Sequence, residues 1–199
     1  MFDYLIRESR LGRSVIFDLD DTLFSEEEFL RSVYSRIAGL YEISFEDAVH
    51  DYLLSTFRKY GRDDIFGGML RVFPNKMIDL EICLAIMREP IVGRSFDLYP
   101  WVSEYAEKSF ATSISIITNG TPQQQKNKIE YLRLDRFFAS THVVYANEHR
   151  KKPHPAAYHW LCASMEITDP IYVGDSHNDK VFADNCGIEF LDSKLIELF

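Results

Sequence analysis

Cysteine is scarce in this sequence, and its scarcity limits the protein classes to consider. The 199 residues include three cysteines, an odd number without the close spacing of a metal site. Each lies in a segment with a helical pattern, so we expect buried, reduced thiols at Cys83, Cys162 and Cys186. A fold held together by disulfide bonds is therefore not expected.

Long hydrophobic runs and basic clusters are also missing. No stretch approaches the roughly 18 consecutive apolar residues of a membrane helix, and the N-terminus has no apolar leader. Asp and Glu outnumber Lys and Arg by 31 to 22, which gives a net charge of −9, and the longest basic run spans only residues 150–152. We therefore expect a cytoplasmic protein that binds neither nucleic acid nor a membrane.

The sequence contains no internal repeat and no low-complexity segment. Hydrophobic residues make up 46% of the chain and aromatic residues 14%. This content is sufficient for one substantial core, or for a core domain with a smaller appendage.

The most informative stretch is residues 13–24, which read RSVIFDLDDTLF. Val15, Ile16 and Phe17 predict a short strand that is buried on both faces. Asp18, Asp20 and Thr22 follow at alternate positions, so an extended backbone would present all three on one side. Neighbouring carboxylates repel each other unless a cation neutralises them, and oxygen ligands of this kind suit Mg²⁺. The simpler alternative is a strand that ends in an acidic turn.

The 70 or so residues after this strand have helical patterns and no strand between them. A connection between parallel strands usually contains a single helix, so four consecutive helices exceed an ordinary crossover. We therefore predict a separate helical bundle, inserted at about residues 23–94. Its four expected helices begin with the capping box Ser25–Glu28, with an N-cap at Ser44, near Phe66 and with an N-cap at Asn75.

From residue 99 onwards the pattern alternates between helices and short apolar strands. Such alternation indicates a mostly parallel sheet with helices on both faces. The predicted fold is therefore a doubly wound, Rossmann-like α/β core, formed by residues 1–22 and 95–199, with the helical bundle as an inserted cap. The expected strands after the first are residues 114–117, 143–144, 171–173 and 188–191.

Polar residues follow the predicted strands at the points where the strands end. In a parallel sheet these ends share one edge, so residues that are distant in the sequence converge there and form the usual ligand site. The residues concerned are Asp18 and Asp20 after the first strand, Thr118 after the second, Lys152 after the third, and Asp175 with Asp179 after the fourth.

These segments resemble the four motifs of the haloacid dehalogenase superfamily, whose members are mostly Mg²⁺-dependent phosphatases. The residues that carry the resemblance occur in the order of the family and span residues 13–191. They are Asp18-Leu19-Asp20-Asp21-Thr22, Thr118-Asn119-Gly120, Lys152-Pro153-His154-Pro155 and Gly174-Asp175-Ser176-His177-Asn178-Asp179.

The resemblance implies a role for each matching residue in catalysis. Asp18 would be the nucleophile that forms an aspartyl-phosphate, and Asp20 the general acid and base. The hydroxyl of Thr118 and the main-chain amides of Asn119 and Gly120 would hold phosphoryl oxygens. Lys152 would offset the negative charge on the nucleophile and on the phosphoryl group.

The same resemblance implies a magnesium site. Asp18, the main-chain carbonyl of Asp20, and Asp175 would be its ligands, while Asp179 would orient Lys152 or a water molecule on the metal. In the form most common among relatives with helical caps, the second aspartate of the fourth motif comes one residue later. The spacing found here instead matches relatives that are similar to phosphoserine phosphatase, and it bears on the expected role of Asp179 and not on that of Asp175.

The resemblance predicts Mg²⁺-dependent hydrolysis of a small phosphomonoester, either a sugar phosphate or a nucleotide monophosphate, by a monomer or a homodimer. A phosphomutase would use the same residues. A 2-haloacid dehalogenase lacks the second aspartate of the first motif, and a non-catalytic binding module would be expected to lose Asp18, Asp20 or Lys152. In the cap, Arg58 and Arg62 are either anion contacts or solvated side chains.

Overall fold

The computed structural model describes residues 1–90 and 96–196, and the chain divides into two compact units. The first unit comprises Met1–Ser25 and Asp97–Phe199, and the second comprises Glu26–Phe96. These divisions fall beside the limits predicted from the sequence, after residue 22 and before residue 95. That the helical unit serves as a cap over a site stays a prediction.

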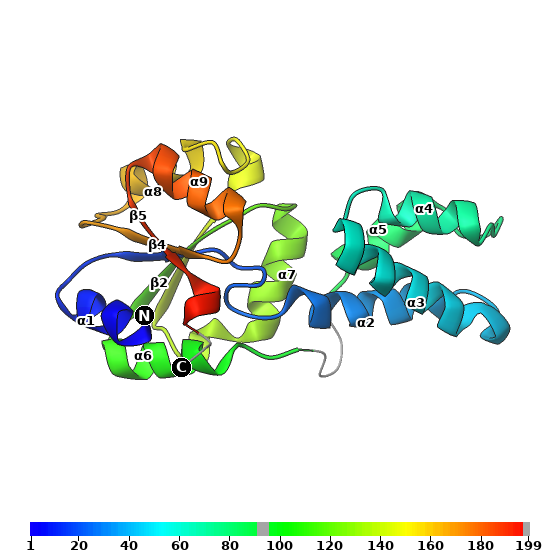
Figure 1. Cartoon of the computed structure of the whole chain (residues 1–199), viewed down its shortest axis with the longest axis horizontal. Coiled ribbons are helices and arrows are strands. Elements are labelled where there is room, and N and C mark those ends of the chain that lie inside the picture. Colours follow the sequence, from blue (N-terminus) through cyan, green and yellow to red (C-terminus); the bar gives the residue numbers. More distant parts are fainter. Residues whose placement is uncertain (91–95, 197–199) are drawn as a thin grey trace. The chain divides into compact units, whose positions relative to one another are not determined.

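The first unit is built on a parallel sheet of five strands (Figure 1). The strand order is β3-β2-β1-β4-β5, and each neighbouring pair is parallel. This order confirms the predicted doubly wound architecture, in which the chain extends the sheet to one side of β1 and then crosses to the other. The strands are β1 (Val15–Phe17), β2 (Ser113–Thr118), β3 (Ser140–Tyr145), β4 (Ile171–Gly174) and β5 (Glu189–Asp192).

Helices cover both faces of this sheet (Figure 1). Side chains alternate along β1, so Ile16 packs in a cluster with residues of α8 and α9 on one face. On the other face the ring of Phe17 lies against Trp101 and Tyr105 of α6, at centroid distances of 6.1 and 5.4 Å. The helices of this unit are α1 (Phe2–Arg10), α6 (Pro100–Ser109), α7 (Pro122–Leu132), α8 (Ala156–Ser164) and α9 (His177–Cys186).

The carboxyl ends of β1 and β4 lie side by side at the point where the strand order reverses. The main-chain N–H of Asp18 donates to the carbonyl of Val173 at 2.8 Å, which extends the pairing of the two strands by one residue. Ligands of doubly wound folds bind at this edge, outside the carboxyl ends of the strands. The sheet therefore brings the first and fourth motifs together.

The second unit consists of helices in its described part, as predicted. The fourth helix begins later than expected, because Asp79 rather than Asn75 is its N-cap and accepts a hydrogen bond from the N–H of Ile82 at 2.9 Å. Asn75 instead closes a local turn with the N–H of Met77. The helices are α2 (Glu26–Ala38), α3 (Ile43–Tyr60), α4 (Ile65–Val72) and α5 (Leu80–Arg88).

Two arginines of this unit that were considered as anion contacts form ion pairs with α2. The guanidinium of Arg58 donates to both carboxylate oxygens of Glu27, at 2.9 and 2.7 Å, and Arg62 pairs with Glu26. Both arginines therefore have partners within their own unit, and contact with an anion stays a prediction.

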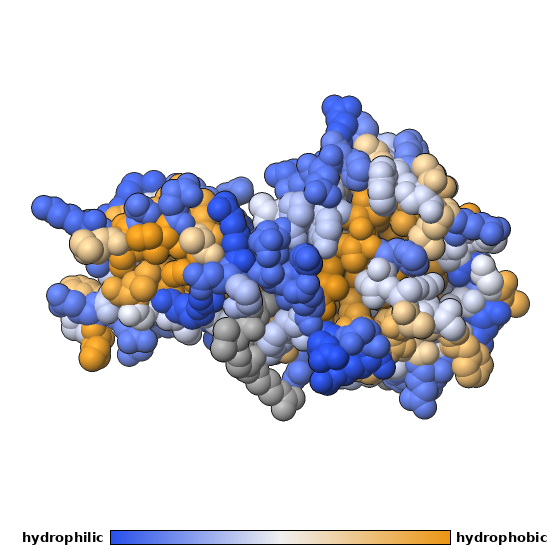
Figure 2. All heavy atoms as spheres, turned by 180° about the vertical axis from the view of Figure 1, so that it is seen from behind, coloured by the Kyte–Doolittle hydropathy of each residue, from blue (hydrophilic) through white to orange (hydrophobic). Residues whose placement is uncertain are grey.

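Hydrophobic residues also reach the surface of this unit, where Figure 2 shows them among hydrophilic ones.

The prediction of three buried thiols is correct only for Cys83. Cys162 is exposed and Cys186 is partly buried, and all three are free. Cys162 faces solvent because the buried stripe of α8 consists of Ala157 and Leu161, and the next residue lies about 100° further around the helix. Among the described residues, no helix has both the length and the apolar character needed to cross a membrane.

Candidate active site

Asp18 stands at the end of the central strand and is the starting point of the site. The strand holds its main chain against β4, and its side chain is largely buried. The ammonium group of Lys152 donates a hydrogen bond to Oδ1 of Asp18 at 2.8 Å. The first and third motifs therefore meet, as the convergence of strand ends predicts.

Lys152 is held on three sides in the interior. Besides Asp18, its Nζ donates to Oδ1 of Asp179 at 2.6 Å and to the hydroxyl of Tyr172 at 2.7 Å. Tyr172 in turn donates to the carbonyl of Ile117 at 3.1 Å. An ammonium group has three donors, and these contacts use all of them. The charge of Lys152 is therefore fixed beside the Asp18 carboxylate.

The side chain of Asn119 places the main chain of Lys152. Its Oδ1 accepts from the N–H of Lys152 at 2.9 Å, and its Nδ2 lies 3.3 Å from the carbonyl of the same residue. The N–H of Gly120, which was predicted to hold a phosphoryl oxygen, donates to Oδ1 of Asn147 at 3.3 Å. The second motif thus lies next to the main chain of Lys152, and the Asn119 side chain and the Gly120 N–H both have partners within the protein.

The fourth motif ends β4 and begins α9. Ser176 is the N-cap of α9 and exchanges hydrogen bonds with Asp179 in a capping box, which orients the Asp179 carboxylate. Gly174 is required at the end of the strand, because a Cβ there would lie 2.6 Å from the Cβ of Asp179. The capped helix end, the glycine and Lys152 together determine where Asp179 lies.

Three carboxylates form the acidic cluster of the site: Asp18, Asp175 and Asp179. Each offers an oxygen atom, and these oxygens all lie within 4.8 Å of one another. Burial raises the pKa of Asp18, although Lys152 acts in the opposite direction, and burial raises the pKa of Asp175 to about 6. The cluster thus sets three carboxylates beside one buried lysine, and its oxygen atoms are ligands that fit a hard divalent cation such as Mg²⁺.

The exposed end of this cluster contacts a second lysine. Nζ of Lys194 donates to the main-chain carbonyl of Asp175 at 2.8 Å and lies 3.3 Å from its Oδ2. The Lys194 side chain is 63% exposed, so water screens its charge and the contact contributes little. Lys194 therefore does not replace a cation at the cluster.

The carboxylate of Asp20 is not part of the acidic cluster. Its Oδ1 accepts a hydrogen bond from Nζ of Lys128 at 2.6 Å, and its Oδ2 accepts one from Nε2 of Gln125 at 2.8 Å. Both donors belong to α7. Of the predicted metal ligands, Asp18 and Asp175 contribute carboxylates to the cluster. Asp20 was predicted to contribute its main-chain carbonyl, and that remains its predicted role.

The expectation that Thr22 lies on the same side as Asp18 and Asp20 requires an extended chain, and the chain turns before it reaches Thr22. The strand ends at Phe17, and Asp21 has a positive φ of 52°, so the alternation of an extended chain does not continue. The buried Oγ1 of Thr22 has no hydrogen-bond partner among the residues that the structure describes. Thr22 therefore lies outside the group of interacting site residues.

Gln125 also connects the first motif to the second. Its Nε2 lies 2.7 Å from Oγ1 of Thr118 and 2.8 Å from the carbonyl of Asn119. The glycine of the motif makes room for this side chain, because a Cβ on Gly120 would lie 3.1 Å from Cδ of Gln125. The positive φ of Gly120, 111°, is also one that other residues rarely adopt. The turn after β2 is therefore matched to Gln125.

The sequence did not reveal three residues that contact the predicted catalytic groups. Gln125 and Lys128 lie in a helix that is mostly polar, yet with Leu132 they follow the i, i+3, i+7 spacing of a buried stripe. Tyr172 is the one hydroxyl-bearing residue in the short strand β4. These patterns could have identified all three residues, but each pattern is weak by itself.

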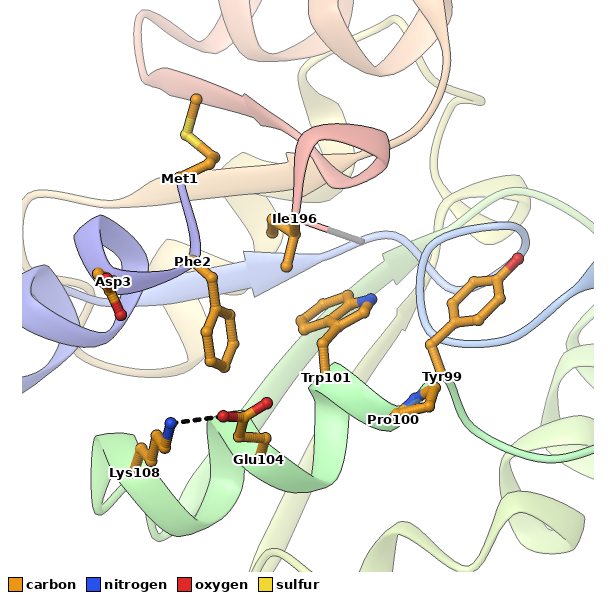
Figure 3. A pocket seen from close by; sticks show the side chains of 9 residues that line it. All are labelled: Met1, Phe2, Asp3, Tyr99, Pro100, Trp101, Glu104, Lys108 and Ile196. Carbon is orange, nitrogen blue, oxygen red and sulfur yellow. Dashed lines mark hydrogen bonds and ion pairs between the residues drawn. The ribbon is translucent and has the colours of Figure 1, made fainter. Parts of the chain in front are cut away.

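A cavity of about 700 Å³ lies elsewhere in the first unit. In Figure 3 the side chains of Phe2, Trp101 and Ile196 lie around it, and Glu104 and Lys108 form an ion pair at its edge. None of the described residues that line it belongs to the four motifs. The candidate chemistry is therefore at the carboxyl edge of the sheet and not in this cavity.

The comparison with protein families finds one match that covers most of the chain. The family described as haloacid dehalogenase-like hydrolase matches residues 15–192, which include all four motifs. No curated protein matches the sequence.

Solved structures with the same fold include dehalogenases and hydrolases. An L-2-haloacid dehalogenase from Xanthobacter autotrophicus has a TM-score of 0.60 at 17% identity, over 90% of this chain and 76% of that one. A magnesium-bound candidate HAD-hydrolase from Bacillus subtilis has 0.55 at 15%, over 89% and 86%. A candidate phosphoglycolate phosphatase from Lactobacillus plantarum has 0.52 at 13%, over 89% and 84%. At these identities the likeness shows the fold.

Proposed function

The chain belongs to the haloacid dehalogenase-like hydrolases, and from this membership we propose that it is a Mg²⁺-dependent phosphatase. Its substrate would be a small phosphomonoester, and the reaction would proceed through an aspartyl-phosphate on Asp18. The observation that carries the proposal is the separation of the two aspartates. Asp18 lies in an acidic cluster beside Lys152, whereas Asp20 is held by neutral and cationic donors of α7.

In the first half-reaction the Asp18 carboxylate attacks phosphorus. A new bond forms between phosphorus and the carboxylate oxygen, while the bond between phosphorus and the ester oxygen breaks. The electron pair of the broken bond stays on the leaving oxygen, which takes a proton from the protonated carboxyl group of Asp20. Lys152 offsets negative charge beside the nucleophile as the phosphoryl group arrives.

In the second half-reaction water attacks the phosphorus of the aspartyl-phosphate. The Asp20 carboxylate, left ionised by the first step, takes a proton from this water. The bond between phosphorus and Asp18 breaks, which releases inorganic phosphate and restores the Asp18 carboxylate. Asp179 keeps Lys152 in place throughout, because its Oδ1 accepts from the ammonium group at 2.6 Å.

The metal would be held by the carboxylates of Asp18 and Asp175 and by the main-chain carbonyl of Asp20. When bound, Mg²⁺ supplies positive charge that stabilises the phosphoryl group and the nucleophile. The acidic cluster supports this assignment, since three carboxylates that offer only oxygen atoms as ligands lie beside one buried lysine. Asp179 contacts Lys152 directly, so we assign it to the lysine rather than to the metal.

Asp20 also supports a phosphatase over a dehalogenase. A halide leaves as an anion and needs no proton, so a dehalogenase has no use for a carboxyl group held at this position. A phosphomutase needs the same proton carrier but transfers the phosphoryl group to a second hydroxyl instead of to water. The release of inorganic phosphate therefore separates the two phosphoryl-transfer reactions.

The proposal is tested by screening the purified chain against sugar phosphates and nucleotide monophosphates. Release of inorganic phosphate with Mg²⁺, and its loss in excess chelator, are the expected results. Chloride release from 2-chloropropionate is measured in parallel. Halide release without phosphatase activity on any member of the panel would overturn the proposal in favour of a dehalogenase, and isomerised sugar phosphate without free phosphate would indicate a mutase.

The covalent step is tested with p-nitrophenyl phosphate, whose leaving group needs little protonation. Asp20→Asn should form the phosphoenzyme and hydrolyse it slowly, so intact-protein mass spectrometry after rapid quenching should show one added phosphoryl group. Asp18→Asn should show none. Rapid turnover by Asp18→Asn, once deamidation back to aspartate has been excluded, would overturn the covalent mechanism.

A further inference from the structure

Helix α7 buries a polar face, which is unusual for a helix in an α/β core. Gln125 is 1% exposed and Lys128 is not exposed at all. A buried ammonium group is costly unless it is paired and hydrogen-bonded. A lysine buried at such a position therefore needs a partner of opposite charge, which offsets the cost of removing the ammonium group from water.

Asp20 supplies that charge, and the two α7 side chains divide its carboxylate between them. Lys128 donates to Oδ1 at 2.6 Å and Gln125 to Oδ2 at 2.8 Å. Nζ of Lys128 also lies 5.8 Å from the centroid of the Phe24 ring, within the range of a cation–π contact. With a donor on each oxygen, the plane of the Asp20 carboxylate is set as well as its position.

The position of α7 depends on the second motif. Residues three apart lie on the same face of a helix, so Gln125 and Lys128 act from one side. The helix begins at Pro122, two residues after Gly120, and Gln125 also contacts Thr118 at the end of β2. The donors of Asp20 are therefore held on a rigid element that is connected directly to the phosphate-binding turn.

We propose that Gln125 and Lys128 are positioning residues that hold the Asp20 carboxylate for proton transfer in both half-reactions. The inference rests on the proposed function, because it assigns the two residues to the proton carrier of that reaction. A general acid or base must lie within hydrogen-bond reach of the atom that it serves. Displacement by about 1 Å can cost on the order of 10²-fold in rate.

The test compares Lys128→Met with Lys126→Met in the full-length protein. Methionine keeps the length of the lysine stem without the charge, and Lys126 is an exposed lysine of the same helix. With phenyl phosphate, which has a poor leaving group, we expect Lys128→Met to lose about 10²-fold in kcat/KM. With p-nitrophenyl phosphate it should form the phosphoenzyme at nearly the wild-type rate and accumulate it. Lys126→Met should resemble the wild type on both substrates.

A second arm measures whether the loss depends on Asp20. When Asp20 is already replaced by Asn, adding Lys128→Met should change the rate of phosphoenzyme formation by no more than about twofold. The effects of substitutions that act through one group are not additive. Gln125→Met removes the donor to the other oxygen of Asp20. Its loss of rate should depend on the leaving group and on the presence of Asp20 in the same way as that of Lys128→Met. Gln125→Met also keeps the test decisive if Lys128→Met does not fold.

Two results separate the inference from the proposed function. If Lys128→Met and Gln125→Met lose equally on both substrates, or lose as much in the Asp20→Asn background, their role is structural and the inference is overturned. If Asp20→Asn itself turns over phenyl phosphate at the wild-type rate, Asp20 is not the proton carrier and the proposed mechanism is overturned. Wild-type behaviour of both α7 variants beside an impaired Asp20→Asn overturns the inference alone.

Discussion

Replacing Lys152 by methionine should destabilise the first unit strongly, whatever reaction the protein catalyses. Methionine fills the space of the lysine stem but leaves Asp18 and Asp179 buried without their shared cation. These carboxylates have oxygens 2.8 and 2.6 Å from Nζ, and Asp179 is 1% exposed. Breaking a buried ion pair by removing one partner typically costs about 3–5 kcal/mol. We expect the free energy of unfolding to fall by about this amount.

The measurement is urea unfolding in the presence of chelator, followed by tryptophan fluorescence. The chain has two tryptophans, Trp101 and Trp160, and both lie in the first unit, so the signal does not report the helical unit. The control is Lys151→Met, which removes the exposed neighbouring lysine. A surface substitution of this kind usually changes stability by about 0.5 kcal/mol or less.

Free energies of unfolding of Lys152→Met and Lys151→Met that differ by less than about 1 kcal/mol would contradict the expected cost of the unpaired carboxylates. A double-mutant cycle gives a second check. Asp179→Asn removes one of the two carboxylates, so in that background the cost of Lys152→Met should fall by at least about 1 kcal/mol. An unchanged cost would mean that the loss comes from packing of the lysine stem and not from its charge.

Three further predictions concern the neighbours of this lysine. Gly174→Ala should cost about 1–3 kcal/mol in the same unfolding assay, because the added Cβ would lie 2.6 Å from the Cβ of Asp179; a cost below about 0.5 kcal/mol would contradict the close approach. Tyr172→Phe removes a hydroxyl bonded to Lys152 and should cost about 1–2 kcal/mol, and unchanged stability would contradict this. Asp175→Asn should weaken Mg²⁺ binding at least about tenfold by titration calorimetry without substrate, whereas unchanged affinity would place the metal elsewhere.

The sheet and the meeting of the four motifs were predictable because both follow from short-range patterns. Strand β1 is a run of three apolar residues bounded by polar ones, and β4 is similar. Once the strands are parallel, their carboxyl ends share one edge, so Asp18, Lys152 and Asp179 have to converge. No information about side-chain packing is needed for this step.

The partners of Asp20 were not predictable by the same reasoning. The rule that alternate residues share a side holds only within a strand, and β1 ends one residue before Asp18. Beyond that point the direction of each side chain depends on the turn at Asp21 and on how closely α7 approaches. A lysine in a polar helix is solvated in most proteins, so its spacing from Gln125 and Leu132 is only a weak local sign that Lys128 is buried.

The separation of the two aspartates has a consequence for metal dependence. Asp18 and Asp175 belong to the cluster that fits a divalent cation, while the Asp20 carboxylate accepts from Gln125 and Lys128 on the side of α7. A cation bound at the cluster would contact Asp20 only through its main-chain carbonyl and would not compete for its carboxylate. The position of Asp20, the proposed proton carrier, would then not depend on whether the metal is bound. The contact between Asp20 and Lys128 should therefore be the same in structures determined with and without Mg²⁺, and a carboxylate that leaves α7 when the metal binds would show that the two functions are coupled.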